Sequence, residues 1–475
     1  MIYFWVVMAY MGGLVGLGLY KSRSVKNQND FMVAGRKVPT ILLVGTLVST
    51  WIGSGSIIAG AGLAYRRGIS ELWGSVGAWA AIVLVYFLAG RVRRIAQYTV
   101  PDILEKRYNK WARILGTVTI IIAYTTIVGY QFKGGGMVLD LVAGIPMKYG
   151  VIFTAVFIIL YTSMAGMISI VTLDIFNGTI ILIGILIAVP FLLHGVGGIQ
   201  HVLTTLPADH FKVFGHENAV WAMGVAFPVF FLLLGESSMY QKFFSAKNEK
   251  AARTAVVGWI AGTIVIETMI CFLSIIASSY FTHLKDSETV ILYTARHGQE
   301  AGLPLFAGVM LLGAAVAIIV STGNSFLLTP STNITRDIYQ RFINPNAGGK
   351  HLVWLQRFWV VILGIMAYLL LTQFKTVLEM AYTAYTMIGA GLTPAILAAF
   401  LWKRVTAAGG VASILGGMLG TLVAKFGFGV GWDYLIFPPI ILSFVLLIVV
   451  SLLTPPSPEE KWKPFMEKQE AGPIR

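Results

Sequence analysis

Long apolar runs dominate this 475-residue sequence and restrict it to a narrow range of folds. A helix rises about 1.5 Å per residue, so about 20 mainly apolar residues cross the ~30 Å hydrocarbon core of a bilayer. About thirteen runs meet this length. They cover 2–20, 40–64, 72–90, 112–141, 149–166, 173–195, 219–241, 252–280, 303–329, 354–373, 377–401, 408–426 and 433–453. Because only helices and closed barrels satisfy their backbone inside lipid, the sequence predicts an all-α integral membrane protein of about thirteen transmembrane helices, the first of them retained as a span.

The composition excludes most soluble classes of protein. Hydrophobic residues make up 57% of the chain and charged residues 12%, whereas soluble domains carry about 25% charged residues because their surface faces water. The formal net charge is +14, but the basic residues lie in the loops between apolar runs. We therefore expect membrane lipid and no nucleic acid as a partner. Neither metal-spaced histidines nor a nucleophile motif is present, so we do not expect an enzyme.

The basic residues of the loops predict the orientation. They are concentrated after the odd-numbered runs, as in the segment 91–113, and in the tail. Cytoplasmic loops carry this excess of lysine and arginine. We expect a plasma (cell inner) membrane protein with its N-terminus outside and its C-terminus in the cytoplasm. The chain then divides into one transmembrane domain, 1–453, and a polar tail, 454–475, which we expect to be loosely ordered.

Polar residues interrupt two of the predicted helices in mid-membrane. The run 40–64 contains Gly53-Ser54-Gly55-Ser56, and the run 219–241 contains Gly235-Glu236-Ser237-Ser238. Glycine weakens a helix interior by up to ~1 kcal/mol relative to alanine, and backbone freed at that depth must be satisfied by protein, water or an ion. Small residues also permit close helix packing. The carboxylate in the second interruption favours a binding site formed by broken helices.

Two further runs carry oxygen-bearing side chains. Ser321, Thr322, Asn324 and Ser325 lie together in the run 303–329. Hydroxyls and unwound carbonyls suit a hard monovalent cation, although serine and threonine also bond back to their own helix. Asp174 lies just inside the cytoplasmic boundary of 173–195, where a carboxylate indicates either a functional site or an interfacial residue.

Seven segments occur in an order and spacing that are more specific than any one of them. They are 30–36 (DFMVAGR), 49–55 (STWIGSG), 130–135 (YQFKGG), 161–174, 240–247 (YQKFFSAK), 335–342 (TRDIYQRF) and 402–406 (WKRVT). In these segments the chain resembles the sodium:solute symporter family, which includes sodium-coupled sugar, proline, pantothenate and sialic acid carriers. The resemblance implies the leucine-transporter-type fold, with two inverted five-helix repeats at spans 2–6 and 7–11. It also implies secondary active symport of sodium and a small organic solute into the cytoplasm by alternating access.

The resemblance implies ion sites as well. The sodium ion would bind the backbone carbonyls of Ser49, Ile52 and Ile318 and the hydroxyls of Ser321 and Thr322. Some members hold a second sodium, and the matching positions here are Asp174, Ser321, Asn324 and Ser325. At one of these positions relatives have serine where this chain has Asn324, whose carbonyl oxygen is still a possible ligand.

Candidate substrate residues follow from the same comparison. Ser56 and Glu236 align with polar contacts of sugar-carrying relatives, and Gln131, Tyr382 and Tyr385 are candidate lining residues. Glu236 has three open roles: it pairs with an ammonium group of the solute, it titrates and makes a proton the coupling ion, or it forms a structural ion pair with Lys133.

Two other functions compete with sodium symport. One is a proton-coupled symporter that uses Glu236 or Asp174. The other is a membrane sensor that binds a solute without transport, against which the short loops argue because they leave no room for a signalling domain. The sequence leaves the solute, the sodium stoichiometry and the oligomeric state open.

Overall fold

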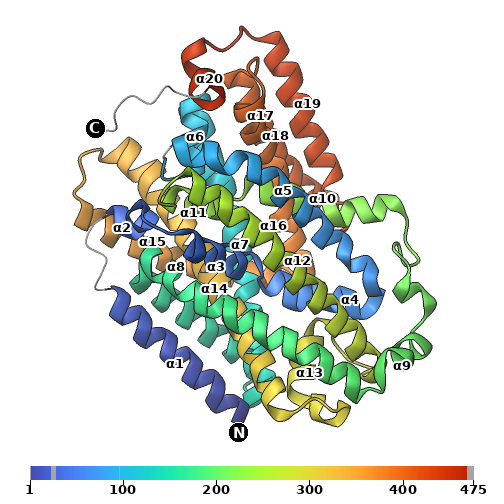
Figure 1. Cartoon of the computed structure of the whole chain (residues 1–475). Helices are drawn as coiled ribbons and strands as arrows, with labels where there is room; N and C mark the ends of the chain where they lie inside the picture. Colours follow the sequence, from blue (N-terminus) through green and yellow to red (C-terminus); the bar gives the residue numbers. More distant parts are fainter. Residues whose placement is uncertain (1, 23–27, 96, 468–475) are drawn as a thin grey trace.

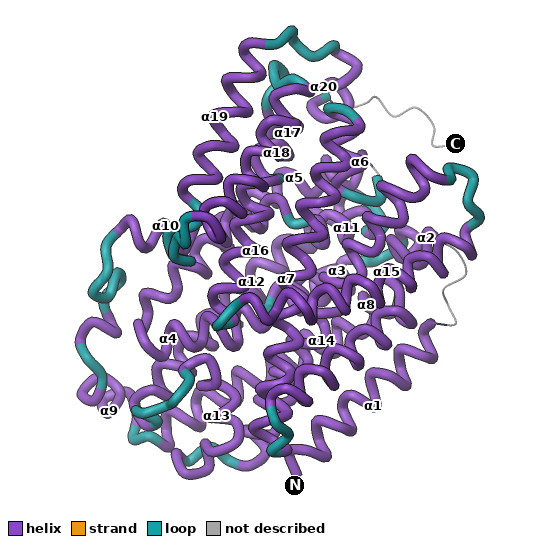
Figure 2. Tube along the Cα trace, turned by 180° about the vertical axis from the view of Figure 1, so that it is seen from behind, coloured by secondary structure: helices purple, strands orange, loops and turns teal. Residues whose placement is uncertain are grey.

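The computed structural model describes residues 2–22, 28–95 and 97–467, and in this part of the chain the regular elements are helices, with no named strand (Figures 1 and 2). The α-helices are α1 (Ile2–Ser22), α2 (Gln28–Val33), α3 (Thr40–Trp51), α4 (Ala61–Arg67), α5 (Leu72–Ile95), α6 (Val100–Arg107), α7 (Lys110–Ala143), α8 (Met147–Gly195), α9 (Gly198–Thr205), α10 (Ala219–Gly235), α11 (Ser237–Ser245), α12 (Glu249–Tyr280), α13 (Val290–His297), α14 (Leu305–Asn333), α15 (Gly349–Leu370), α16 (Val377–Gly391), α17 (Thr393–Leu401), α18 (Ala407–Leu422), α19 (Phe437–Leu453) and α20 (Glu459–Met466). Short 3₁₀ or π-helical segments are Ala34–Arg36, Gly55–Gly60, Gly68–Glu71, Ala208–Phe211, Ser287–Thr289, Gly298–Ala301, Ile334–Ile343, Leu371–Gln373 and Val423–Gly427.

Among the described residues, ten helices are long and apolar enough to cross a membrane. Three shorter apolar helices accompany them, at Ile2–Gly18, Thr40–Trp51 and Phe437–Leu453. Every predicted run coincides with helix in the structure. The all-α membrane fold is thereby confirmed, whereas the count of about thirteen crossings stays a prediction.

Both predicted interruptions are breaks in the helices. α3 ends at Trp51, and Ile52 takes an extended conformation with φ −73° and ψ 102°. A π-helical turn, Gly55–Gly60, then leads into α4. In the second break α10 ends at Gly235, and Glu236 is extended with φ −71° and ψ 107° before α11 begins. Each break frees backbone groups in the interior of the protein.

Two breaks were not predicted as such. Gly166 divides α8 with φ 63° and ψ 173°, a left-handed conformation that glycine adopts readily. The structure thus links the predicted runs 149–166 and 173–195 directly at this glycine. The run 377–401, predicted as one helix, is divided at Leu392 into α16 and α17. Pro394 lies in the first turn of α17, where proline is tolerated. This proline was the feature of the sequence that indicated a new helix start within the run 377–401.

The centre of the bundle consists of α7, α14 and α16, the most deeply buried of the long helices. α14 packs against α8, α7 and α3, and α16 packs against α7 and α10. Figure 1 places α1 at one edge of the molecule and α17–α20 at another. The broken helices pack against this centre, α3 against α14 and α10 against α16, so that their free backbone groups are kept from lipid.

The N-terminus of α16 is held by a carboxylate from a distant segment. Glu288, buried between α12 and α13, accepts hydrogen bonds from the backbone N–H groups of Val377 and Leu378 at 3.0 and 2.9 Å. A carboxylate at this position satisfies helix donors that have no partner within the helix. The segments 196–218 and 281–302, which lie between predicted spans, contain the short helices α9 and α13.

The expectation of a loosely ordered tail is wrong for its described part. α20 docks on the bundle through Phe465, which is buried and packs against Phe400 with ring centroids 5.6 Å apart. The Lys403 ammonium lies over the ring of Trp462 at 4.6 Å. Two aromatic residues within four positions give this helix an apolar face that the polar composition of the tail obscured. Residues 468–475 lie outside the described part.

α5 and α10 approach each other closely at Gly77. A Cβ atom added there would lie 2.2 Å from the carbonyl oxygen of Ala226. Such an approach between membrane helices requires a residue without a side chain.

We expect Gly77→Ala to destabilise the protein by roughly 1–3 kcal/mol, because the added methyl group forces α5 and α10 apart. The measurement is the thermal unfolding midpoint of purified protein in detergent, which should fall by several degrees. Gly13→Ala is the matched control, since nothing lies within 4 Å of the added atom and alanine favours the helix. Equal midpoints for the two variants would contradict the packing argument.

Candidate functional site

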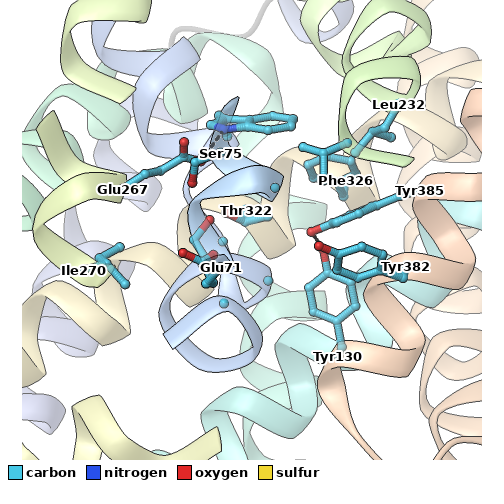
Figure 3. A pocket seen from close by; sticks show the side chains of 17 residues that line it. Glu71, Ser75, Tyr130, Leu232, Glu267, Ile270, Thr322, Phe326, Tyr382 and Tyr385 are labelled. Carbon is cyan, nitrogen blue, oxygen red and sulfur yellow. Dashed lines mark hydrogen bonds between the residues drawn. The ribbon is translucent and has the colours of Figure 1, made fainter. Parts of the chain in front are cut away.

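A cavity of about 60 Å³ lies beside the first break (Figure 3). At roughly 10–15 Å³ per water on this measure, it holds a few waters or a small organic group. Ser56, Tyr382 and Tyr385, three of the predicted substrate residues, line it. Thr322, a predicted sodium ligand, lies in the same wall. The structure therefore brings part of both predicted sites to one place.

Thr322 connects α14 to the end of α3. Its hydroxyl lies 3.1 Å from the carbonyl oxygen of Thr50 and 3.1 Å from that of Ile52. The Ile52 carbonyl is available because its residue has left the helix. Two predicted sodium ligands, Ile52 and Thr322, are thus in contact, and the Thr50 carbonyl was not predicted.

The other predicted sodium ligands are placed differently. The hydroxyl of Ser49 donates to the carbonyl of Gly45 in its own helix at 2.8 Å. Ser49 on α3 and Ile318 on α14 belong to two helices that pack against each other. The hydroxyl of Ser321 donates to Oδ1 of Asp174 at 2.6 Å and so bonds to α8 in this conformation.

Asp174 is the centre of the positions matched to a second sodium. Its Oδ2 accepts a hydrogen bond from the Thr46 hydroxyl at 2.5 Å, so both oxygens have a hydroxyl donor. The two remaining positions bond to other helices. Asn324 accepts from Thr162 at 2.9 Å, and Ser325 shares a hydrogen bond with Thr50 at 3.0 Å.

A buried lysine that the sequence reasoning overlooked lies near these groups. Lys242 on α11 is 1% exposed, and its ammonium donates to the Ser238 hydroxyl at 3.0 Å and to Ser325 at 3.4 Å. It interacts electrostatically with Asp174 and with Glu236. Lys242 directly follows the apolar run 219–241, and this position was the feature of the sequence that pointed to it. A lysine buried there requires polar or acidic partners.

Glu236 lies in the second break and does not line the cavity. The ion pair with Lys133, one of its three predicted roles, is wrong: the described ion pairs do not include it. The ammonium of Lys133 donates instead to the carbonyl of Lys375 at 2.5 Å. The charge that faces Glu236 is that of Lys242.

Side chains from α7 satisfy the backbone of both breaks. Oε1 of Gln131 accepts from the backbone N–H of Ser54 at 3.1 Å and from its hydroxyl at 2.6 Å. The Tyr124 hydroxyl accepts from the backbone N–H of Ser238 at 3.1 Å. Gln131, predicted as a lining residue, therefore holds the break just behind the cavity wall. Its Nε2 is buried and makes no hydrogen bond within the described part of the chain.

The tyrosines of α16 approach the first break where it has no side chain. A Cβ atom on Gly55 would lie 2.2 Å from the hydroxyl oxygen of Tyr385. That hydroxyl is 3.4 Å from the hydroxyl of Tyr130, and the rings of Tyr382 and Tyr385 are 5.7 Å apart. Glycine at position 55 thus allows an aromatic wall to form directly against the backbone.

Two carboxylates of the cavity wall were missed. Glu71 and Glu267 lie across the cavity from the tyrosines (Figure 3). Glu267 accepts from the indole N–H groups of Trp51 and Trp79, each at 2.9 Å. Its position within the apolar run 252–280 was a sufficient signal, because an intramembrane carboxylate indicates a functional site.

The sequence is similar to known solute transporters over nearly its whole length. Residues 31–417 match the model of the sodium:solute symporter family. The osmoregulated proline transporter OpuE of Bacillus subtilis (strain 168) is 25% identical over 495 residues, which cover 97% of this chain and 96% of the relative. The sodium/pantothenate symporter of Escherichia coli (strain K12) is 26% identical over 466 residues, with 94% and 95% covered. A sodium/proline symporter of Staphylococcus aureus (strain NCTC 8325 / PS 47) is 27% identical, with 94% and 92% covered.

Solved structures agree on the fold. A Na⁺-coupled sialic acid symporter in a substrate-bound outward-open state superposes with a TM-score of 0.82 at 16% identity, covering 96% of this chain and 98% of that one. MhsT in complex with L-phenylalanine gives a TM-score of 0.58 at 13% identity, covering 87% and 99%. These likenesses confirm the leucine-transporter-type fold, while the exact bounds of its repeats stay a prediction. Because the family model spans most of the sequence, the chain belongs to the sodium:solute symporter family.

Proposed function

We propose that sodium binds where α14 crosses the break between α3 and α4, and that a small organic solute binds in the adjoining cavity. The single observation that carries this is the position of Thr322. Its hydroxyl contacts the carbonyls of Thr50 and Ile52, and the same residue lines the cavity. One side chain therefore contacts both sites, which gives each ligand a direct route to change the affinity for the other.

The ligand set suits sodium. A hard monovalent cation takes oxygen ligands, and carbonyls and hydroxyls supply them without further buried charge. The set consists of Thr322 and Ile52, with the carbonyls of Ser49 and Ile318 and the hydroxyl of Ser321 completing it. Ser321 would turn from Asp174 to do so. Asp174, Asn324 and Ser325 are the candidates for a second sodium.

Sodium at this place joins the broken α3 to α14 and so stabilises one arrangement of the two parts. That arrangement presents the cavity to the outside on the predicted orientation. Rocking of one helical repeat against the other then opens the cytoplasmic side, where sodium and solute leave. The membrane potential adds about 2.3 kcal/mol per charge per 100 mV to inward movement.

We expect sodium, but not equimolar potassium, to raise the unfolding midpoint of the purified protein. Ligand binding to the folded state stabilises it by RT ln(1 + [L]/Kd), about 2.7 kcal/mol at one hundred times Kd. Thr322→Val keeps the shape of the side chain and removes its oxygen, and should abolish the shift. Thr421→Val is the matched control, because Thr421 bonds only to the Gly417 carbonyl of its own helix.

A sodium shift that survives in Thr322→Val would place the ion elsewhere. A midpoint that responds to pH and not to sodium, and loses this response in Glu236→Gln or Asp174→Asn, would make the proton the coupling ion. Size-exclusion chromatography of each variant establishes that the comparison is made on folded protein.

A cluster of ion pairs joins α6, α7 and the segment that follows α14. Arg113 on α7 contacts Asp102 and Glu105 of α6 and lies 3.2 Å from Asp337 beyond α14. Arg113 is 5% exposed and Asp337 is fully buried. The positive-inside rule places this cluster on the cytoplasmic side. We take it as the closed inner gate of an outward-facing conformation.

We expect Arg113→Gln to shift the population towards an inward-facing state. Removing one partner of a buried pair costs roughly 3–5 kcal/mol, and ~1.4 kcal/mol already changes a population ratio about tenfold. The readout is the labelling of Ser56→Cys by an impermeant thiol reagent applied from either side of the membrane, in a Cys271→Ala background. Labelling from the cytoplasmic side should rise by about tenfold or more.

Arg341→Gln is the control for the gate. Arg341 pairs with Glu105 but is 54% exposed, and exposed pairs contribute about 0–1 kcal/mol. Equal labelling ratios for the two variants would mean that the Arg113 cluster is not a gate.

A further inference from the structure

The charged groups of the cavity wall are all acidic. Glu71 and Glu267 line the cavity, and its wall contains no lysine, arginine or histidine. Neither carboxylate takes part in an ion pair among the described residues. Lys242 does not line the cavity, and its ammonium donates to Ser238 and Ser325. The cavity therefore presents two acidic side chains for which its wall provides no counter-ion.

Two indole groups hold the carboxylate of Glu267 in place at the cavity, and both of its oxygens act as hydrogen-bond acceptors. Each of its two oxygens accepts a hydrogen bond from an indole, and an indole N–H can only donate. Glu71 has the Cys271 thiol beside it and lies close enough to Glu267 for their charges to interact. Glu267 is buried and Glu71 is partly buried, and two neighbouring carboxylates in such a place repel each other and are poorly solvated. A positively charged ligand would relieve both penalties.

The opposite wall is aromatic. Tyr130, Phe326, Tyr382 and Tyr385 line the cavity across from the two carboxylates, whereas Trp51, also in the wall, lies beside Glu267, to which its indole donates. Aromatic faces attract alkylammonium and guanidinium groups, most strongly where water is excluded. Behind Gly53 the Nε2 of Gln131 is buried, 3.1 Å from where a Cβ of that glycine would be, and among the described residues it has no hydrogen-bond partner. It offers one hydrogen bond to a neutral acceptor.

We propose that the solute is a small organic cation: an amine, guanidinium or quaternary ammonium compound with no carboxylate of its own. Its charged nitrogen lies between the Glu71–Glu267 pair and the tyrosines, and a hydroxyl or carbonyl oxygen faces Gln131. This inference rests on the proposed function, because it assigns the solute to the same cavity. A zwitterion or an anion is disfavoured because the wall has no basic side chain for its carboxylate.

The test compares probes that differ by one carboxylate. L-prolinamide is set against L-proline, and choline against glycine betaine, with methylammonium and tetramethylammonium as minimal cations. Each is titrated into purified wild-type protein in saturating sodium, and the apparent Kd is obtained from the unfolding midpoint. In at least one of the two matched pairs the cation should bind about tenfold or more tightly than its zwitterionic partner, a difference that corresponds to ~1.4 kcal/mol.

Two variants assign this preference to the carboxylates. Glu71→Gln and Glu267→Gln should each raise the apparent Kd of the cation by about tenfold or more. The difference in Kd between the cation and its zwitterionic partner should become smaller. Glu267→Gln could fail to fold because it weakens the contacts with the two indoles. In that case Glu71→Gln alone is compared with the wild type. Asp140→Asn removes one carboxylate from an exposed position at the end of α7 and should leave cation binding unchanged. Sodium-driven uptake of the tightest probe into proteoliposomes then shows that the bound cation is carried.

Three outcomes would overturn the proposal. The first is that the zwitterions bind as tightly as the cations, and the second is that none of the four cations stabilises the wild type. The third is that both glutamate variants bind the cations as tightly as Asp140→Asn does. A fourth outcome, in which Glu267→Gln abolishes the sodium shift and no organic cation competes, would make sodium the occupant of the pair. The sodium shift in wild type without solute is a separate readout, so failure here leaves the proposed function standing.

Discussion

Every backbone N–H and C=O group inside a membrane needs a partner, and this requirement governs the two broken helices. Neighbouring side chains take the place of the missing helix bonds. Gln131 and Tyr124, both on α7, accept from Ser54 and Ser238. The hydroxyl of Thr322 on α14 contacts the carbonyl oxygen of Ile52. The breaks are stabilised because α7 and α14 carry polar side chains that meet these backbone groups, and an ion could replace one of the contacts.

The two breaks are joined through α14. Thr50 at the end of α3 shares a hydrogen bond with Ser325, and Ser325 accepts one from Lys242. Lys242 also donates to Ser238, next to the second break. A change at the proposed sodium site can therefore reach α11 through three polar contacts without passing through the apolar core. Such a chain with two arrangements is a physical route for coupling, since packed membrane helices shift as units.

The sequence contained the positions of both breaks, because glycine and serine in mid-run oppose a continuous helix. It could not reveal which oxygens meet. Ser321 and Thr322 are adjacent in the chain, yet one bonds to α8 and the other to the end of α3, since successive residues of a helix point about 100° apart. Glu236 was predicted as a substrate residue because it interrupts an apolar run. Glu267 also lies in an apolar run, and it is this glutamate that lines the cavity. Periodicity alone does not say which carboxylate faces a cavity and which faces Lys242.

The distribution of buried charge separates the two acidic sites. Asp174 and Glu236 share the ammonium of Lys242, so this inner group has two carboxylates and one fixed cation. Ionised, it lacks one positive charge, which a sodium ion nearby would supply. Glu71 and Glu267 have no fixed cation in the wall they share. The protein thus supplies one positive charge itself, the ammonium of Lys242. Sodium would neutralise the group of Asp174 and Glu236, and the organic cation would neutralise Glu71 and Glu267. The two ligands therefore do not compete for one acidic group.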